Sequence, residues 1–218
     1  MAVPEFITPE DLLEIYALGL FPMAESATEK GFGIVEPKER ALLPIKDLHI
    51  PKRLKRTLLQ KPYRVTIDTT FEHVIDQCAK ARPETWINDD IQILFTSLHD
   101  RGIAHSIECW NGDELVGGLY GLALGGTFCG ESMFSTQTDA SKIALIYLCA
   151  VLDHAGFTQL DAQFHNPHLE QFGIYQIPQE DYVTTMQAHL TDEVSFGAHG
   201  KSIEEILVQY LEKRGLLV

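Results

Sequence analysis

The sequence has 218 residues, of which 45% are hydrophobic, so the chain can bury a sizeable core and shows no sign of disorder. It has no apolar run near the ~20 residues of a membrane helix, and its first residues, MAVPEFITPEDLL, lack the basic and apolar regions of a signal peptide. We therefore expect a cytoplasmic protein without membrane contact. The formal net charge of −14 disfavours general attraction to nucleic acid, so a nucleic-acid partner needs a local basic surface.

The N-terminal part begins with a helix signal. Thr8 followed by the letters PED is typical of a helix start and Gly19 of a helix end, which predicts a helix over 9–18. The stretch from there to about His49 reads as irregular and is too long for a plain connector. We expect it to wrap a partner domain or a functional site.

A local basic surface is present in the segment PKRLKRTLLQKPYR. It has no acidic residue and holds six of the chain's 17 lysines and arginines, namely Lys52, Arg53, Lys55, Arg56, Lys61 and Arg64. A solvated helix face and a surface that contacts phosphates are both compatible with this composition.

The middle of the chain predicts mixed helix and strand. We expect a strand over 63–68, a helix over 71–81, and a second helix that is capped by Asn88 and ends near Arg101. The letters AHSIECW and DELVGGLYGLAL flank Asn111-Gly112, which is the strongest short signal for a hairpin.

The following elements complete a core. A strand over 127–133 precedes a helix over 140–154, which is apolar nearly all round and therefore buried, and Gly156 ends this helix before a strand over 158–164. Three antiparallel strands, a helix and a returning strand resemble the core of the GCN5-related N-acyltransferases. The predicted fold class is thus α+β, with a helix-rich N-terminal part and a core that contains a mixed, mainly antiparallel sheet.

Three segments describe the expected organisation: 1–62 with the first helix, the wrapping loop and the basic segment, 63–190 with the acyltransferase-like core, and 191–218 with an appended helix. The appended helix starts at a capping box of Ser202 and Glu205 in SIEEILVQYLEKRG. Its apolar residues share one face, so it either docks on the core or seeks a partner; they are Ile203, Ile206, Leu207, Tyr210 and Leu211.

A lone carboxylate, Glu131, lies in the apolar stretch FCGESMFS, where an ionised group is costly without a cation. Strand alternation places it on one face with Cys129 and Met133. In the last core strand the same rule groups Leu160, Ala162 and Phe164 on one face and Asp161, Gln163 and His165 on the other. Glu131, Asp161 and Gln163 either converge on a site or form a core network that satisfies itself.

The order of several short motifs is similar to that of the bacterial leucyl/phenylalanyl-tRNA–protein transferase family. They extend roughly from Thr8 to Leu190 and read GLFPM, EP..R, YRVTID, TWI, AHSIE, DELVGGLYG, FCGESMFS, DASKIAL, LDAQF..PHLE.FG and IPQEDY. The resemblance implies transfer of Leu or Phe, with Met as a further candidate, from aminoacyl-tRNA to the N-terminal Arg or Lys of proteins. The product carries an N-terminal degradation signal.

The resemblance also implies residue roles. Glu131 would hold the basic terminus of the acceptor, Trp86 would stack on the terminal adenine, and tRNA would dock on Lys52, Arg53, Lys55 and Arg56. The acyl side chain would occupy a pocket lined by Leu119, Phe128, Met133, Leu145, Leu148 and Leu160. The chain departs from the family at Ile34 and Val35, where a Trp is usual, and at Leu119, where Met is frequent.

The chemistry of such a reaction needs little machinery, because an aminoacyl ester is already activated. Gln163 could accept a hydrogen bond from the attacking amine, and Asp161 could fix that amide or pair with the substrate's charge. We find no Walker-type loop, no coenzyme A loop and no His/Cys cluster at ligand spacing, and the four cysteines read as reduced core thiols. We expect a monomer that requires neither metal nor cofactor.

Three other functions are compatible with parts of the sequence. A hydrolase could use Ser132 or Cys129 as nucleophile, although GESMF lacks the second glycine of a nucleophile elbow. A non-catalytic RNA-binding module would use the basic segment alone. An acetyltransferase of the same fold would bind coenzyme A.

Overall fold

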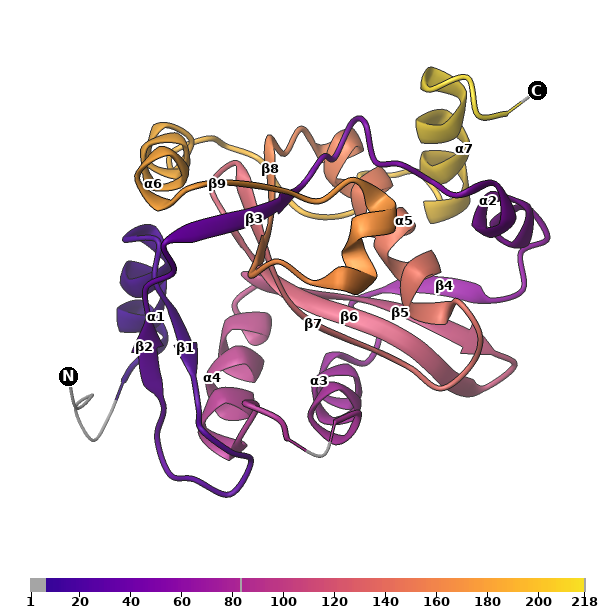
Figure 1. The fold of residues 1–218 in the computed structure, drawn as a ribbon. Coiled ribbons are helices and arrows are strands. Elements are labelled where there is room, and N and C mark those ends of the chain that lie inside the picture. The colour runs from indigo at the N-terminus through magenta and orange to yellow at the C-terminus, as the bar shows by residue number, and fades with distance from the viewer. Residues whose placement is uncertain (1–6, 83, 218) are drawn as a thin grey trace.

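The computed structural model describes residues 7–82 and 84–217, in which a seven-stranded sheet is covered by helices on both faces (Figure 1). The strand order across the sheet is β4 (Arg64–Ile67), β5 (Ala104–Asn111), β6 (Glu114–Leu124), β7 (Thr127–Ser135), β8 (Gln159–Gln163), β3 (Glu39–Leu43) and β9 (Tyr175–Pro178). Neighbours pair antiparallel except β7 and β8, which are parallel. The predicted α+β class with a mixed, mainly antiparallel sheet is confirmed.

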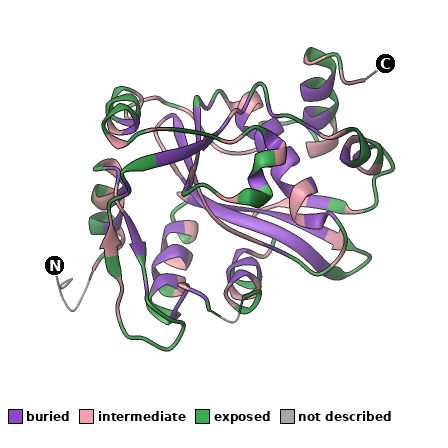
Figure 2. Cartoon of the chain, in the orientation of Figure 1, coloured by how far each residue is buried: buried purple, intermediate pink, exposed green. Residues whose placement is uncertain are grey.

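The helices form two apolar layers against this sheet. One layer contains α2 (Lys52–Leu59), α5 (Ala140–Ala155) and α7 (Ile203–Lys213), and the other contains α1 (Pro9–Ala17), α3 (Phe71–Lys80), α4 (Asp89–Asp100) and α6 (Gln179–Ala188). Figure 2 shows burial concentrated in the long central strands and in α5. The buried α5 agrees with the prediction from its continuous apolar sequence.

Local signals located most of these helices correctly. The side chain of Thr8 accepts a hydrogen bond from the backbone N–H of Asp11, and the carboxylate of Asp11 accepts one from the backbone N–H of Thr8. Asn88 caps α4 by accepting from the backbone N–H of Ile91. Gly156 ends α5 with a φ of 90°, a conformation that glycine adopts without strain. The short 3₁₀ helix η1 (Pro167–Phe172), β9 and α6 were not predicted from the sequence.

The expectation that residues 19–49 are irregular was wrong. The strands β1 (Phe21–Met23) and β2 (Gly33–Val35) form a separate two-stranded sheet, and β3 pairs with both β8 and β9 inside the main sheet. The apolar residues of β3 are buried because two strands from the other end of the chain enclose it. The main sheet therefore contains strands from both sides of the predicted segment boundary at residue 62.

The C-terminal helix α7 docks on the core, which decides between the two readings of its apolar face. Its buried residues pack with those of α5, and the hydroxyl of Tyr210 donates to the carbonyl of Ile45 at 2.6 Å. Within 7–82 and 84–217, no helix combines the length and the apolar character that crossing a membrane requires.

Candidate active site

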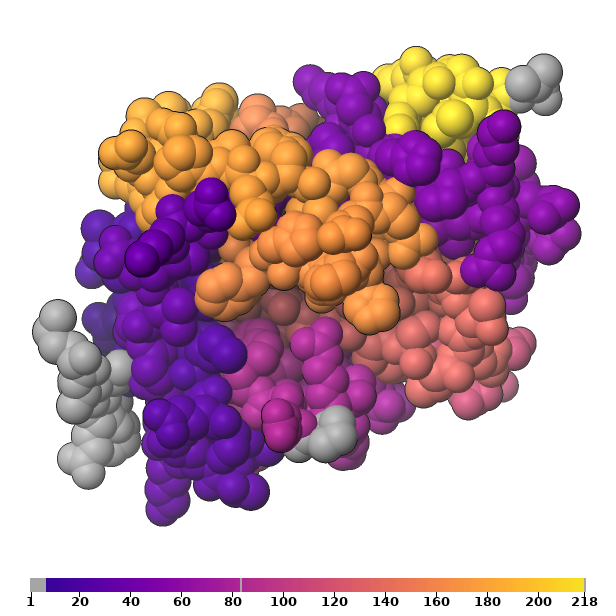
Figure 3. Space-filling view, viewed as in Figure 1, coloured from indigo at the N-terminus to yellow at the C-terminus, as the bar shows by residue number. Residues whose placement is uncertain are grey.

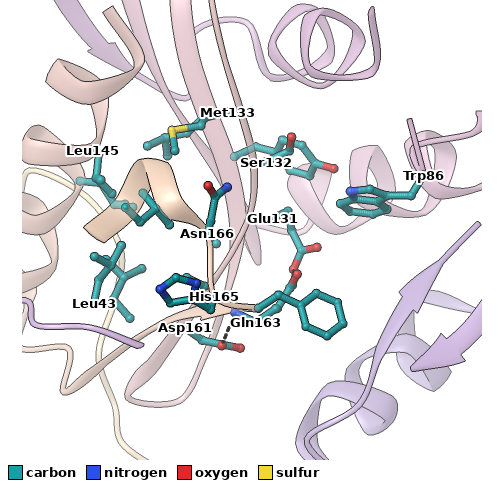
Figure 4. A pocket seen from close by; sticks show the side chains of 18 of the residues that line it. Leu43, Trp86, Glu131, Ser132, Met133, Leu145, Asp161, Gln163, His165 and Asn166 are labelled. Atoms are coloured by element: carbon teal, nitrogen blue, oxygen red, sulfur yellow. Dashed lines mark hydrogen bonds between the residues drawn. The ribbon is translucent and has the colours of Figure 1, made fainter. Parts of the chain in front are cut away.

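A cavity of about 190 Å³ lies where β7 and β8 separate (Figure 4). The two strands pair only from Thr127–Gln159 to Cys129–Asp161, and β7 then continues alone along β6 to Ser135. The space that opens beyond this pairing is apolar at one end and polar in the middle. The apolar residues are Leu43, Leu119, Met133, Leu145, Leu148, Leu160 and Leu169, and the polar ones include Glu131, Ser132, Asp161, Gln163, His165 and Asn166.

Five of the six residues expected to form an acyl pocket line this cavity, whereas Phe128 does not. Phe128 lies in the paired part of β7 and is fully buried, with its ring stacked on Phe196 at 5.3 Å between centroids. Its partner on β8 is Leu160, within the paired part of the two strands. We therefore remove Phe128 from the proposed lining and add Leu43 and Leu169, which come from segments that the sequence did not connect with the site.

A β-bulge at Glu131 sets the orientation of the side chains around it. Tyr120 pairs with Ser132 while Gly121 pairs with Gly130, so Glu131 has no partner on β6. The bulge reverses the alternation, and Cys129 and Met133 consequently pack in opposite apolar layers. The prediction that Cys129, Glu131 and Met133 share one face was wrong for this reason.

The carboxyl group of Glu131 has two neutral donors and, among residues 7–82 and 84–217, no ion-pair partner. The hydroxyl of Tyr16 and the amide Nε2 of Gln163 donate to its Oε1 at 2.7 and 2.8 Å. Its Oε2 is buried and accepts no hydrogen bond from any described residue. Burial raises the pKa of Glu131 to about 7, although the two hydrogen bonds act in the opposite direction. The site thus holds a carboxyl group that lines the cavity and has a buried oxygen that no described residue uses.

A buried cation, Arg40, lies near this site and pairs with Asp161 rather than with Glu131. Arg40 and Asp161 are both completely buried, with Nη2 to Oδ2 at 2.5 Å and Nε to Oδ1 at 2.8 Å. The guanidinium also donates to the carbonyl of Gly19 at 2.8 Å and lies over the ring of Tyr182 at 4.3 Å from its centroid. Burial alone would lower the pKa of Arg40, but the adjacent carboxylate raises it, so the guanidinium stays charged.

Sequence reasoning missed Arg40 as a site residue. The only signal was its position as the last residue of the EP..R motif, and its partner lies 121 positions away.

Gln163 ends β8 in a left-handed conformation with a φ of 62°. Its backbone N–H donates to Oδ1 of Asp161 at 2.8 Å, which stabilises this turn and aims the amide at Glu131. The turn also redirects Phe164 to Phe21, with ring centroids 5.3 Å apart. Alternation predicted that Phe164 shares a face with Leu160. It does not, because the strand has already ended at Gln163.

The structure brings Glu131, Asp161 and Gln163 together but leaves the basic helix elsewhere. Trp86 lines the cavity from the side opposite to its apolar end (Figure 4), whereas none of the four cations of α2 is among the lining residues. In α2, Lys55 donates to the carbonyl of Leu216 at 3.0 Å and Arg53 lies 3.4 Å from Asp139. Lys52 and Arg56 are exposed.

The unusual positions Ile34 and Val35 lie in β2, opposite Pro22 and Phe21. They are absent from the described lining of the cavity.

Neither nucleophile that the hydrolase hypothesis names, Cys129 or Ser132, is activated by its surroundings in the described part of the chain. Cys129 is completely buried, and burial holds the pKa of its thiol well above the usual range. Ser132 lines the cavity, but no hydrogen bond joins its hydroxyl to a histidine in the described part of the chain.

Comparison with known proteins gives a consistent result. Residues 42–187 match the family described as leucyl/phenylalanyl-tRNA protein transferase. A relative from Hyphomonas neptunium is 52% identical over 197 residues, which cover 89% of this chain and 76% of the relative. Relatives from Caulobacter vibrioides and Phenylobacterium zucineum are 52% and 46% identical, over 80% and 87% of this chain and 82% and 87% of their own. All three carry the name leucyl/phenylalanyl-tRNA–protein transferase.

Proposed function

This chain belongs to the leucyl/phenylalanyl-tRNA–protein transferase family, and we propose that it moves Leu or Phe from aminoacyl-tRNA onto proteins that begin with Arg or Lys. It is an aminoacyltransferase, and its donor is an aminoacyl-tRNA. The observation that carries the choice of acceptor is the buried, unpartnered Oε2 of Glu131 beside an apolar cavity. A carboxylate in this state gains most from a cationic ligand, because the ligand replaces the lost hydration.

The neighbouring groups support an attack by the acceptor amine. Gln163 uses its Nε2 on Glu131, which leaves its amide oxygen free to accept a hydrogen bond from the amine and to orient the lone pair. Asp161 accepts from the backbone of Gln163 and is neutralised by Arg40, so it acts by positioning Gln163 rather than by binding the substrate's charge. The departing ribose oxygen can take the amine's proton, so the transfer can proceed with these groups alone.

Incubation of the protein with labelled leucyl-tRNA and a peptide that begins with Arg tests this function. We expect label in the peptide, and far less with a peptide that differs only in starting with Ala or Glu. Equal labelling of all peptides would refute the proposed acceptor preference. Absence of labelling from every donor and acceptor would refute the transferase assignment itself.

Filling the cavity should stop transfer without unfolding the protein. Met133 is partly buried against the α5 layer, so Met133→Trp overpacks the cavity at a cost of about 1–3 kcal/mol, which a folded domain tolerates. Transfer of both Leu and Phe should fall strongly, whereas the nearly isosteric Met133→Leu should retain it. Unchanged transfer by the Trp variant would remove Met133 from the pocket.

We further propose that tRNA docks on the basic helix α2. Lys52→Glu with Arg56→Glu tests this, because both side chains are exposed and their reversal leaves the contacts of Arg53 and Lys55 in place. The double variant should bind tRNA more weakly. Each lost phosphate contact should reduce the slope of log affinity against log salt by about 0.7–0.9. If affinity and slope both stay at the parent values, the helix presents only a solvated face.

A monomer in a reducing compartment such as the cytoplasm is the final part of the proposal. The four cysteines are free and buried, as is usual for proteins of reducing compartments. Light scattering on the active enzyme measures the mass of the species, and a stable dimer would contradict this part.

A further inference from the structure

Arg82 brings a positive charge to the cavity. It lies between α3 and α4, four residues before Trp86, and both side chains line the cavity. Among the described lining residues no other lysine or arginine is present. Figure 3 shows that the magenta surface formed by this part of the chain faces the orange surface formed by residues near 165.

The guanidinium of Arg82 is available for a ligand. The side chain is exposed, and no carboxylate of the described residues lies within ion-pair distance of it. Its neighbour Lys80 differs, because its Nζ is held by Asp76 at 2.7 Å. The two lining carboxyl groups, Glu131 and Asp161, disfavour an anion, whereas the guanidinium of Arg82 attracts one.

The chemistry of the proposed donor contains such an anion. The 3′ end of an aminoacyl-tRNA consists of the acyl group, the ribose that carries the ester, the adenine and the phosphate on the 5′ oxygen of that ribose. The cavity offers apolar side chains for the acyl group and an indole for the base, and base stacking on an aromatic ring contributes about 1–3 kcal/mol. A guanidinium matches a phosphate with two parallel hydrogen bonds.

We propose that Arg82 binds the phosphate on the 5′ side of the terminal adenosine, so that residues 82 and 86 together hold the last nucleotide of the donor. This inference rests on the proposed function. It differs from the docking of tRNA on α2, which concerns a part of the tRNA outside the cavity. Arg82 would act on the positioning of the ester and not on the chemistry of the amine.

A pair of small donors isolates this contact. Leucyl-adenosine and leucyl-adenosine 5′-monophosphate, both esterified at the 3′ oxygen, differ only in the phosphate that Arg82 is proposed to bind. The parent enzyme should use the phosphorylated donor with a kcat/KM about tenfold higher or more, as expected for a charge-assisted contact. Arg82→Ala should abolish this preference while leaving the kcat/KM for leucyl-adenosine unchanged.

Three controls distinguish a phosphate contact of Arg82 from a general effect of surface charge or of folding. Arg82→Lys should keep part of the preference, Lys80→Ala should keep all of it, and the melting temperature of each variant should match that of the parent because the altered side chains are exposed. With leucyl-tRNA, Arg82→Ala should lower the salt slope of binding by about 0.7, the value for one contact to a single strand.

The role of Arg82 would be overturned if Arg82→Ala lowered the kcat/KM for both small donors equally. It would also be overturned if the parent enzyme showed no preference for the phosphorylated donor. If neither small donor is a substrate, an unchanged salt slope with leucyl-tRNA overturns it equally. A failure of the proposed function looks different, because the parent enzyme would then transfer Leu from none of the donors.

Discussion

Replacement of Arg40 by methionine is expected to lower the free energy of unfolding by about 3–5 kcal/mol and to abolish transfer. The substitution leaves the completely buried Asp161 without its cation and removes the hydrogen bond to the carbonyl of Gly19. The loss of activity follows because Asp161 holds the backbone of Gln163 in its left-handed turn. Urea denaturation at neutral pH measures the stability, and labelled transfer to an Arg peptide measures the activity.

The double variant Arg40→Met with Asp161→Leu provides the control. With both charges removed, most of the lost stability should return, because the penalty arises from an unpaired buried charge. Activity should not return, since Gln163 loses its anchor. The assignment of a shared structural and positioning role would be contradicted if Arg40→Met unfolded within about 1 kcal/mol of the parent.

Glu131→Gln is expected to raise the KM for peptides that begin with Arg or Lys by about 30-fold or more, with a smaller effect on kcat. The substitution keeps the shape but removes the charge that faces the proposed cation, and truncating one member of a buried charge pair costs about 2–5 kcal/mol. Gln163→Ala should behave in the opposite way, lowering kcat more than it raises KM. Parent-like transfer by both variants would end the assignment.

The pKa of Glu131, about 7, predicts the direction in which the affinity for the acceptor peptide changes with pH. Because burial raises the pKa of Glu131 above its usual 4.5, the charged form predominates only above about pH 7. The affinity of the parent for an Arg peptide should therefore rise between about pH 6 and pH 8, and that of Glu131→Gln should stay nearly constant. Peptide binding should be measured rather than turnover, since the peptide's amine also titrates in this range.

The same shift predicts an effect on stability. A carboxyl group with a raised pKa in the folded state stabilises the protein fully below its unfolded pKa, and this contribution is lost as the pH rises through about 7. Glu131→Gln should consequently gain stability relative to the parent at about pH 8, and the gain should be smaller at about pH 5. A constant difference between the two proteins across this range would show that Glu131 is not desolvated in the folded enzyme.

The sequence by itself determined the elements whose signals are local. The caps at Thr8 and Asn88 and the end of α5 at Gly156 depend on neighbouring residues alone, and the structure places them as predicted. The predicted hairpin also forms, but its two loop residues are Gly112 and Asp113, one position later than predicted, because Asn111 still pairs with Glu114. The motif order determined the family in the same way, and the sequence brought Glu131, Asp161 and Gln163 to attention because polar groups in apolar strands need partners.

Only the tertiary structure decided how these groups are used. Alternation could not predict the bulge at Glu131, because a bulge is defined by the register with β6, nor the turn at Gln163, which is held by a hydrogen bond to a buried carboxylate. The cavity exists because β7 and β8 stop pairing, and Asp161 takes its cation from β3 across 121 residues. The bond that holds the Gln163 turn is local, because Asp161 lies two residues away. The bulge, the cavity and the ion pair of Asp161 arise from contacts between distant segments, and the local pattern of residues contains no information about which segments will meet.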